Sequence, residues 1–138
     1  MPAPPPIVTI IDDDESVRRA LRRLIKSIGL NVEAFATAEE FLEGFTPDSQ
    51  DRYHEPGTTR CLILDVHLPG LSGLELQERL KVETRELPVI FMTAYEDARK
   101  QERALQMGAV AFLYKPFEQQ TLLEALQKGI ARTRAAVG

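Results

Sequence analysis

Short apolar segments alternate along the chain with longer amphipathic ones. Five segments of five or six residues favour β-strands, because they are rich in β-branched or aromatic side chains and end at turn-forming residues. The weak alternation of the second is typical of a strand at a sheet edge. The five are Ile7–Ile11, Asn31–Phe35, Cys61–Asp65, Pro88–Thr93 and Val110–Tyr114.

The segments between these strands carry apolar residues at helical spacing. A first helix is predicted to end near Gly29, and a capping box formed by Thr37 and Glu40 predicts the start of a second. Another helix follows the turn at Gly73, and one covers Asp97–Met107. The apolar faces are Val17, Leu21, Leu24, Ile25 and Ile28; Ala38, Phe41, Leu42 and Phe45; Leu74, Leu76 and Leu80; and, in a last helix, Leu122, Leu123, Leu126 and Ile130.

Strands that alternate with helices require crossover connections, which predicts an α/β fold with a parallel sheet covered on both faces. Spacing alone leaves the strand order open between 2-1-3-4-5 and half of a Rossmann-like sheet. We expect a proline-rich lead-in over residues 1–6, one domain over 7–132 and a tail over 133–138. The polar stretch 46–60 is predicted to be a long loop within that domain.

The amino-acid composition narrows the classes of protein to which the chain can belong. The 138 residues, 43% of them apolar, suit one domain with one core. No apolar run is long enough to cross a bilayer and no secretory signal opens the chain, so we expect a cytoplasmic protein without membrane contact. The net charge of −4 argues against direct nucleic-acid binding by this domain. The lone Cys61 is expected to be a buried hydrophobe, and His54 and His67 lack the spacing of zinc ligands.

Basic residues cluster on the first predicted helix. This pattern favours a solvated helix face over a docking patch. The residues are Arg18, Arg19, Arg22, Arg23 and Lys26.

Polar side chains stand at four of the predicted strand ends. Asp12, Asp13 and Asp14 follow the first strand, and Asp65, Thr93 and Lys115 stand at the ends of the third, fourth and fifth. Each alone could cap a helix, begin a turn or be an ordinary surface residue. Because ligands of such sheets bind at the carboxyl ends of the strands, their coincidence predicts a functional site.

The charges at these ends indicate the chemistry. Three carboxylates with one ammonium leave a net negative site, which should attract a cation, and oxygen-only ligands suit Mg²⁺. A carboxylate beside a metal ion, a lysine and a hydroxyl has the parts for phosphoryl transfer.

Four motifs, in this order on alternating elements, resemble the receiver domains of two-component response regulators. The resemblance runs from Ile7 to about Ile130 and is strongest to the subgroup that usually carries a C-terminal helix-turn-helix output domain. The motifs are Ile10–Asp13; Leu62–Gly70 followed by Ser72 and Gly73; Met92–Ala94; and Lys115–Phe117.

The resemblance implies a flavodoxin-like sheet of order 2-1-3-4-5 and a role for each site residue. Asp65 would accept a phosphoryl group from a sensor histidine kinase. Mg²⁺, or Mn²⁺, would be bound by Asp13, Asp65 and the backbone carbonyl of His67, with Asp12 reaching it through water. The phosphoryl oxygens would be held by Lys115, the Thr93 hydroxyl and the backbone N–H groups of Val66 and Ala94. The Lys115–Pro116 bond would be cis.

The resemblance also implies how the signal is read. Thr93 and Phe112, which stands where many receivers have Tyr, would form the switch, and His67 and Tyr95 would tune the phosphate lifetime. The surface of the fourth helix, fifth strand and fifth helix would serve homodimerisation or output binding. The domain would assist only its own phosphorylation and dephosphorylation and turn over no external substrate. Whether a DNA-binding output domain follows is left open.

Three other functions compete with this interpretation. An aspartate-nucleophile phosphohydrolase would need a D-x-D segment after the first strand, whereas the acceptor candidate Asp65 follows the third. A Rossmann nucleotide-binding protein would need G-x-G-x-x-G after Ile7–Ile11, which is absent. A degenerate receiver acting only as a scaffold would be expected to lack site residues.

Overall fold

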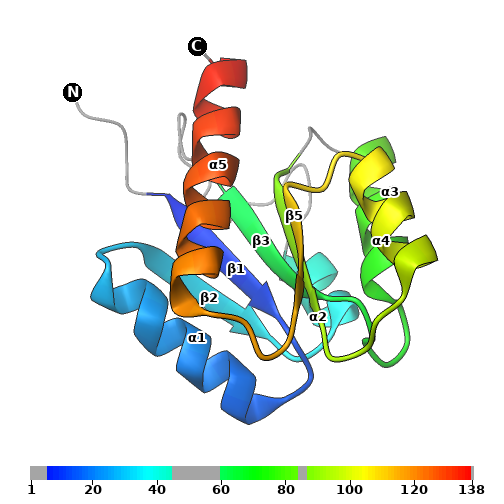
Figure 1. Cartoon of the computed structure of the whole chain (residues 1–138), viewed down its shortest axis with the longest axis horizontal. Coiled ribbons are helices and arrows are strands. Elements are labelled where there is room, and N and C mark those ends of the chain that lie inside the picture. The colour runs from blue at the N-terminus through cyan, green and yellow to red at the C-terminus, as the bar shows by residue number, and fades with distance from the viewer. Residues whose placement is uncertain (1–5, 45–59, 84–86, 138) are drawn as a thin grey trace.

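The computed structural model describes residues 6–44, 60–83 and 87–137, and Figure 1 shows five strands and five helices that alternate along the chain. The strands are β1 (Ile7–Ile11), β2 (Asn31–Phe35), β3 (Arg60–Asp65), β4 (Val89–Thr93) and β5 (Ala111–Tyr114). The helices are α1 (Glu15–Ser27), α2 (Ala38–Gly44), α3 (Gly73–Glu83), α4 (Ala98–Gln106) and α5 (Gln119–Val137).

The five strands form one parallel sheet in the order β2-β1-β3-β4-β5. This order confirms the flavodoxin-like alternative and places β2 at an edge, as its weak alternation predicted. The central strands β1, β3 and β4 are buried along their whole length. Their side chains therefore contribute to two separate hydrophobic cores, one on each face of the sheet.

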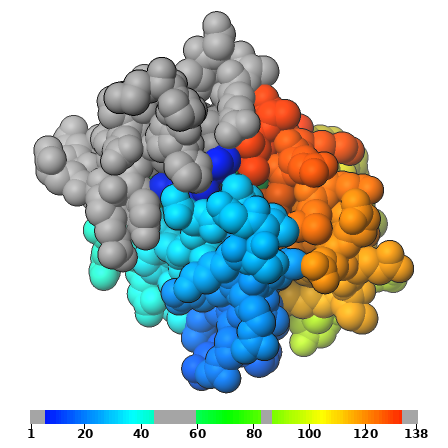
Figure 2. Space-filling model, turned by 90° about the vertical axis from the view of Figure 1, so that its left-hand side faces the viewer, coloured from blue at the N-terminus to red at the C-terminus, as the bar shows by residue number. Residues whose placement is uncertain are grey.

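Successive residues of the central strands point to opposite faces. Ile10 and Ile63 pack with α1 and α5, whereas Ile11 and Leu64 pack with α2, α3 and α4. α1 and α5 thus cover one face and the other three helices cover the second (Figure 1). α1 also lies beside β2 on the side of the molecule that Figure 2 turns to the viewer.

Capping residues set the helix ends. The Asp14 side chain accepts from the backbone N–H of Ser16 at the start of α1. Gly29 follows α1 with φ +86°, a left-handed conformation that glycine adopts readily, which confirms the predicted stop. At α2 the Glu40 N–H donates to the Thr37 hydroxyl at 3.1 Å, while the Glu40 carboxylate accepts from Ala36 rather than from Thr37.

Two element boundaries differ from the prediction. β3 begins at Arg60, which we had assigned to the loop, because its guanidinium lies 2.6 Å from the Glu33 carboxylate of β2 and is satisfied within the sheet. α5 continues to Val137, through most of the expected tail. The rest of the predicted loop, residues 46–59, lies outside the described residues, as does Phe45.

Two further observations concern the chain as a whole. The Lys115–Pro116 bond is cis, as the resemblance implied. Within the described residues, no helix combines the length and the apolar character needed to span a bilayer.

Candidate functional site

Three strands of the sheet bring an ion-pair network to its carboxyl edge. Asp12 directly follows β1, Asp65 ends β3 and Lys115 directly follows β5. The ammonium of Lys115 lies 2.8 Å from Oδ2 of Asp12 and 3.2 Å from Oδ2 of Asp65. Parallel strands end at one edge, so residues far apart in sequence meet there, as predicted.

Asp13 completes an acidic cluster with Asp12 and Asp65. One carboxylate oxygen from each lies within 4.8 Å of the other two. Asp12 is fully buried, whereas Asp13 is exposed and gives solvent access to the cluster. Since all three donors are carboxylate oxygens, the residues fit a hard divalent cation such as Mg²⁺ better than a softer metal.

The network leaves the acceptor candidate in an unfavourable electrostatic setting. Burial raises the pKa of Asp65 above its usual range, and the nearby charge of Asp12 adds to this, although Lys115 and a backbone N–H act in the opposite direction. Burial opposes the charge of Lys115, yet its hydrogen bond to Asp12 and the two carboxylate charges raise the pKa of its ammonium. The lysine is therefore a fixed positive charge, shared between two carboxylates.

The segment after Asp65 turns back on the carboxylate. The His67 N–H donates to Oδ1 of Asp65 at 2.9 Å. The Val66 N–H instead donates to the Met92 carbonyl of β4 at 3.1 Å. The Val66 N–H is thus bonded within the sheet in this structure, whereas the His67 N–H faces the carboxylate. The contact of Val66 with a phosphoryl oxygen stays a prediction.

Thr93 ends β4, the strand next to β3, and so lies near the end of the strand that carries Asp65. Thr93 is buried, and its hydroxyl accepts from the Tyr95 N–H at 3.1 Å. No residue that the structure describes accepts from the N–H of Ala94. The rings of His67 and Tyr95 meet edge to face, with centroids 5.2 Å apart. The two positions expected to tune the phosphate lifetime are therefore in contact.

Phe112 of β5 is only 8% exposed and lies beside Phe91 of the neighbouring strand β4. Its ring centroid is 5.9 Å from that of Phe91 and 5.6 Å from that of Tyr114. The Tyr114 hydroxyl in turn bonds the side chain of Gln101 on α4. Phe112 is thus linked by packing to Phe91 of β4 and, through Tyr114, to Gln101 of α4.

Three residues that sequence reasoning missed support the site. The Arg18 guanidinium donates to the backbone carbonyl of Asp12 at 2.8 Å, and the Glu39 carboxylate accepts from the Leu71 N–H at 3.0 Å. At Gly73, a Cβ would lie 2.4 Å from the carbonyl oxygen of Asp65. No local pattern marks a contact of Arg18 or Glu39 with the site, whereas Gly73 belongs to the motif after Asp65 but was not expected to lie against the carbonyl of that residue.

The lone cysteine lies apart from these groups. Cys61 is fully buried near the start of β3, which confirms that it is a core hydrophobe. Burial raises the pKa of its thiol to about 12. His54 lies outside the described residues.

Comparison with known proteins agrees with this geometry. The family model for the response regulator receiver domain matches residues 8–127. Nodulation protein W of Bradyrhizobium diazoefficiens is 44% identical to this chain, and the match covers 93% of this chain and 52% of that protein. The response regulator protein TodT of Pseudomonas putida is 37% identical, and the match covers 90% of this chain and 51% of that protein. The chain therefore spans about half the length of these curated relatives.

A solved structure has the same fold. The response regulator StyR superposes with a TM-score of 0.83 at 41% identity, over 96% of this chain and 63% of that one. The sheet order, the acidic cluster with its lysine, and these matches lead to one conclusion: the chain belongs to the response regulator receiver domains, a family whose function is to be phosphorylated on an aspartate.

Proposed function

We propose that Asp65 accepts the phosphoryl group of a sensor histidine kinase. The observation that carries the proposal is the position of its buried carboxylate, between the ammonium of Lys115 and the acidic pair Asp12 and Asp13. A carboxylate oxygen of Asp65 would attack the phosphorus of a kinase phosphohistidine. The bond from phosphorus to the imidazole nitrogen would break, and that nitrogen would keep the electron pair and then take a proton.

Receiver domains bind Mg²⁺ at an acidic cluster, and Asp12, Asp13 and Asp65 form such a cluster here. Asp13, Asp65 and the backbone carbonyl of His67 would hold Mg²⁺, or Mn²⁺, with Asp12 acting through water. A bound cation supplies charge neutralisation for the oxygens of the transferring group. Arg18 would contribute by fixing the backbone at Asp12.

The remaining site residues would bind the phosphoryl oxygens. Lys115 already lies 3.2 Å from Asp65 and would exchange that contact for a phosphoryl oxygen. Thr93 would turn its hydroxyl from Tyr95 to a second oxygen, and the Ala94 N–H would help to hold it. The Val66 N–H would supply the remaining backbone contact by exchanging its bond to the Met92 carbonyl for a phosphoryl oxygen.

As a member of a signalling family, the protein would act as a switch, assisting only its own phosphorylation and dephosphorylation. The Thr93–Phe112 pair would transmit the signal, and contact between His67 and Tyr95 would limit water access and so tune the phosphate lifetime. The α4-β5-α5 surface would pair with a second copy or an output partner, and a DNA-binding output domain would follow if the chain is part of a longer protein. We place the domain at 7–132, in the cytoplasm, where its kinase acts.

Incubation with acetyl phosphate and Mg²⁺ tests the assignment. Intact mass should show one added phosphoryl group on the wild type and none on Asp65→Asn. Asp14→Asn is the matched control: Asp14 neighbours the cluster but caps α1, and Asn caps equally well, so labelling should persist. Labelling of Asp65→Asn at the wild-type rate would show that another residue is the acceptor.

A further inference from the structure

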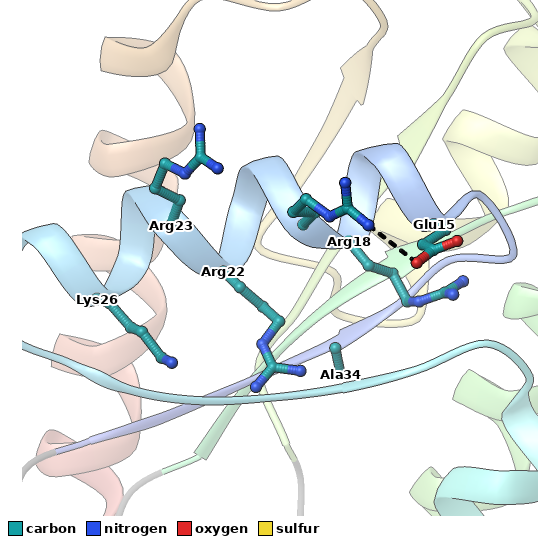
Figure 3. A pocket seen from close by; sticks show the side chains of 7 residues that line it. Glu15, Arg18, Arg22, Arg23, Lys26 and Ala34 are labelled. Atoms are coloured by element: carbon teal, nitrogen blue, oxygen red, sulfur yellow. Dashed lines mark hydrogen bonds and ion pairs between the residues drawn. The ribbon is translucent and has the colours of Figure 1, made fainter.

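A basic groove lies between α1 and the edge strand β2, beside the buried residues of α1. Figure 3 shows Arg22 and Lys26 pointing from α1 towards β2, on which Ala34 lies, whereas Arg23 points away. The groove continues along β2 past Asn31 and Val32. Its cationic lining consists of Arg18, Arg19, Arg22, Arg23 and Lys26.

The acidic residues of the groove are already engaged. Glu15 pairs with Arg19 at 3.1 Å, and Glu33 pairs with Arg60 at 2.6 Å. By contrast, the side chains of Arg22, Arg23 and Lys26 form no hydrogen bond or ion pair with any residue that the structure describes. Like charges four residues apart on a helix repel one another, so Arg22 and Lys26 would be stabilised by an anion between them and β2.

The backbone of β2 also offers unused hydrogen-bonding groups. The Asn31 N–H donates to the Pro6 carbonyl, and the Phe35 carbonyl accepts from the Asp12 N–H. Since backbone groups of a strand alternate in direction, those of Val32 and Ala34 face away from β1. Within the described part of the chain only β1 pairs with β2. An exposed edge of this kind can accept a further strand.

The spacing of the cations along α1 matches the spacing of the outward backbone groups along β2. Residues four apart on α1, such as Arg18, Arg22 and Lys26, are separated by about 6 Å along the helix axis. Residues two apart on a strand are separated by about 6.6 Å. An extended segment with an acidic residue at every second position could therefore face these cations while its backbone pairs with Val32 and Ala34. A nucleic acid would use the cations only.

We propose that the α1–β2 groove binds an extended acidic segment of a partner protein as an added strand beside β2. Carboxylates of the segment pair with Arg22 and Lys26, and its backbone bonds the outward N–H and carbonyl groups of Val32 and Ala34. Figure 2 shows this part of α1 and β2 at the molecular surface. The inference goes beyond the proposed function and does not depend on Asp65.

A fluorescent heptapeptide of alternating Glu and Val, titrated into the full chain, tests the charge requirement. We expect saturable binding that weakens with salt and weakens at least tenfold in the double variant Arg22→Glu, Lys26→Glu. The double variant Arg99→Glu, Lys128→Glu, an equal charge change at exposed positions of α4 and α5, should leave affinity within twofold. Equal weakening by this control variant would overturn the proposal, because it would show attraction to overall charge.

Amide hydrogen exchange on the wild type tests the strand pairing. The peptide should slow exchange of Val32 and Ala34 at least tenfold, with little change at Asn31, whose N–H is already bonded. A peptide with the same charges, N-methylated at the amides that would pair, should bind at least tenfold more weakly. Equal binding of the methylated peptide, or competition by an oligothymidylate without protection of Val32 and Ala34, would show a general polyanion surface and overturn the proposal.

Discussion

The ionised carboxylate of Asp65 lowers the stability of the unphosphorylated fold, because it is buried beside that of Asp12. Its pKa in the folded state lies above the ordinary value of 3.8, chiefly through burial. Between these two pKa values the folded protein retains a proton that the unfolded chain has lost, so lowering the pH through this interval favours folding. Above it, the ionised carboxylate destabilises the fold.

Asp65→Asn should therefore be more stable than the wild type at pH 7 in the absence of divalent cations. The difference should shrink as the pH falls through the folded-state pKa of Asp65 and become constant below 3.8. Urea unfolding of both proteins over a pH series measures the difference in their free energies of unfolding. Because the two proteins share all other titrating groups, the contributions of those groups cancel in this difference. A wild type more stable than the variant at pH 7 would mean that Lys115 outweighs burial.

Gly73 offers a second prediction at the scale of one residue. A Cβ at this position would lie 2.4 Å from the Asp65 carbonyl oxygen and 3.1 Å from Cα of Val66, so the end of β3 would have to move. We expect Gly73→Ala to lower the free energy of unfolding by about 1–3 kcal/mol. Phosphorylation should also slow, because Asp65 would be displaced.

Gly44→Ala is the control for this substitution. Gly44 lies in α2, and a Cβ there would meet nothing within 4 Å. Alanine should leave phosphorylation unchanged and stabilise the helix by up to about 1 kcal/mol. Equal stability and labelling of both variants would show that α3 can shift away from β3 without affecting the acceptor.

At the scale of elements, β4, β5 and α4 are connected through aromatic packing. Thr93 ends β4, and Phe112 of β5 packs against Phe91 and Tyr114. Movement of the Thr93 hydroxyl towards a phosphoryl oxygen would change the space behind it, and because Phe112 has no hydroxyl, its ring can lie inside without a polar partner. In this structure Phe112 is buried, so the rearrangement available to it is small.

This arrangement predicts a coupling between Thr93 and association of two copies. Beryllofluoride with Mg²⁺, a mimic of the phosphoryl group, should strengthen wild-type dimerisation and have much less effect on Thr93→Ala. Sedimentation equilibrium measures both constants. If the two proteins respond equally, the coupling is wrong even where Asp65 is correctly assigned. Ser27→Ala, which removes an exposed hydroxyl at the end of α1, outside the α4-β5-α5 surface, serves as a control and should respond as the wild type does.

For the whole molecule, the acidic cluster links stability to divalent cations. A ligand that binds only the folded state at ten times its dissociation constant stabilises that state by about 1.4 kcal/mol. We expect Mg²⁺ to raise the thermal midpoint of the wild type, relative to NaCl of equal ionic strength, and EDTA to reverse the effect. Asp13→Ala should be more stable without Mg²⁺, through loss of repulsion, and insensitive to it. An undiminished response of this variant would place the cation elsewhere.

The sequence predicted the positions of the site residues more reliably than their contacts. Asp12, Asp65 and Lys115 were identifiable because parallel strands end at one edge, and this follows from local patterns alone. The strand order was not decided by those patterns and depended on the family resemblance. Local patterns describe where an element begins, but they carry little information about which strand it will neighbour.

Several of the contacts that escaped prediction join residues far apart in the sequence. Arg60 begins β3 because Glu33 on another strand satisfies its charge, and the Val66 N–H is occupied because β4 continues far enough to accept it. Glu39 supports the loop after β3 from α2. Each depends on a partner distant in the sequence, so no spacing rule within one segment could have indicated it.

The bond between Lys115 and Asp12 joins residues 103 positions apart, across the strand ends of β3 and β4. Proteins are synthesised from the N-terminus, so the acidic cluster emerges from the ribosome well before its lysine. A nascent chain that ends before β5 exposes Asp12, Asp13 and Asp65 without the ammonium that balances them. We therefore expect the site to be complete only after nearly all of the domain has been translated and β5 has docked.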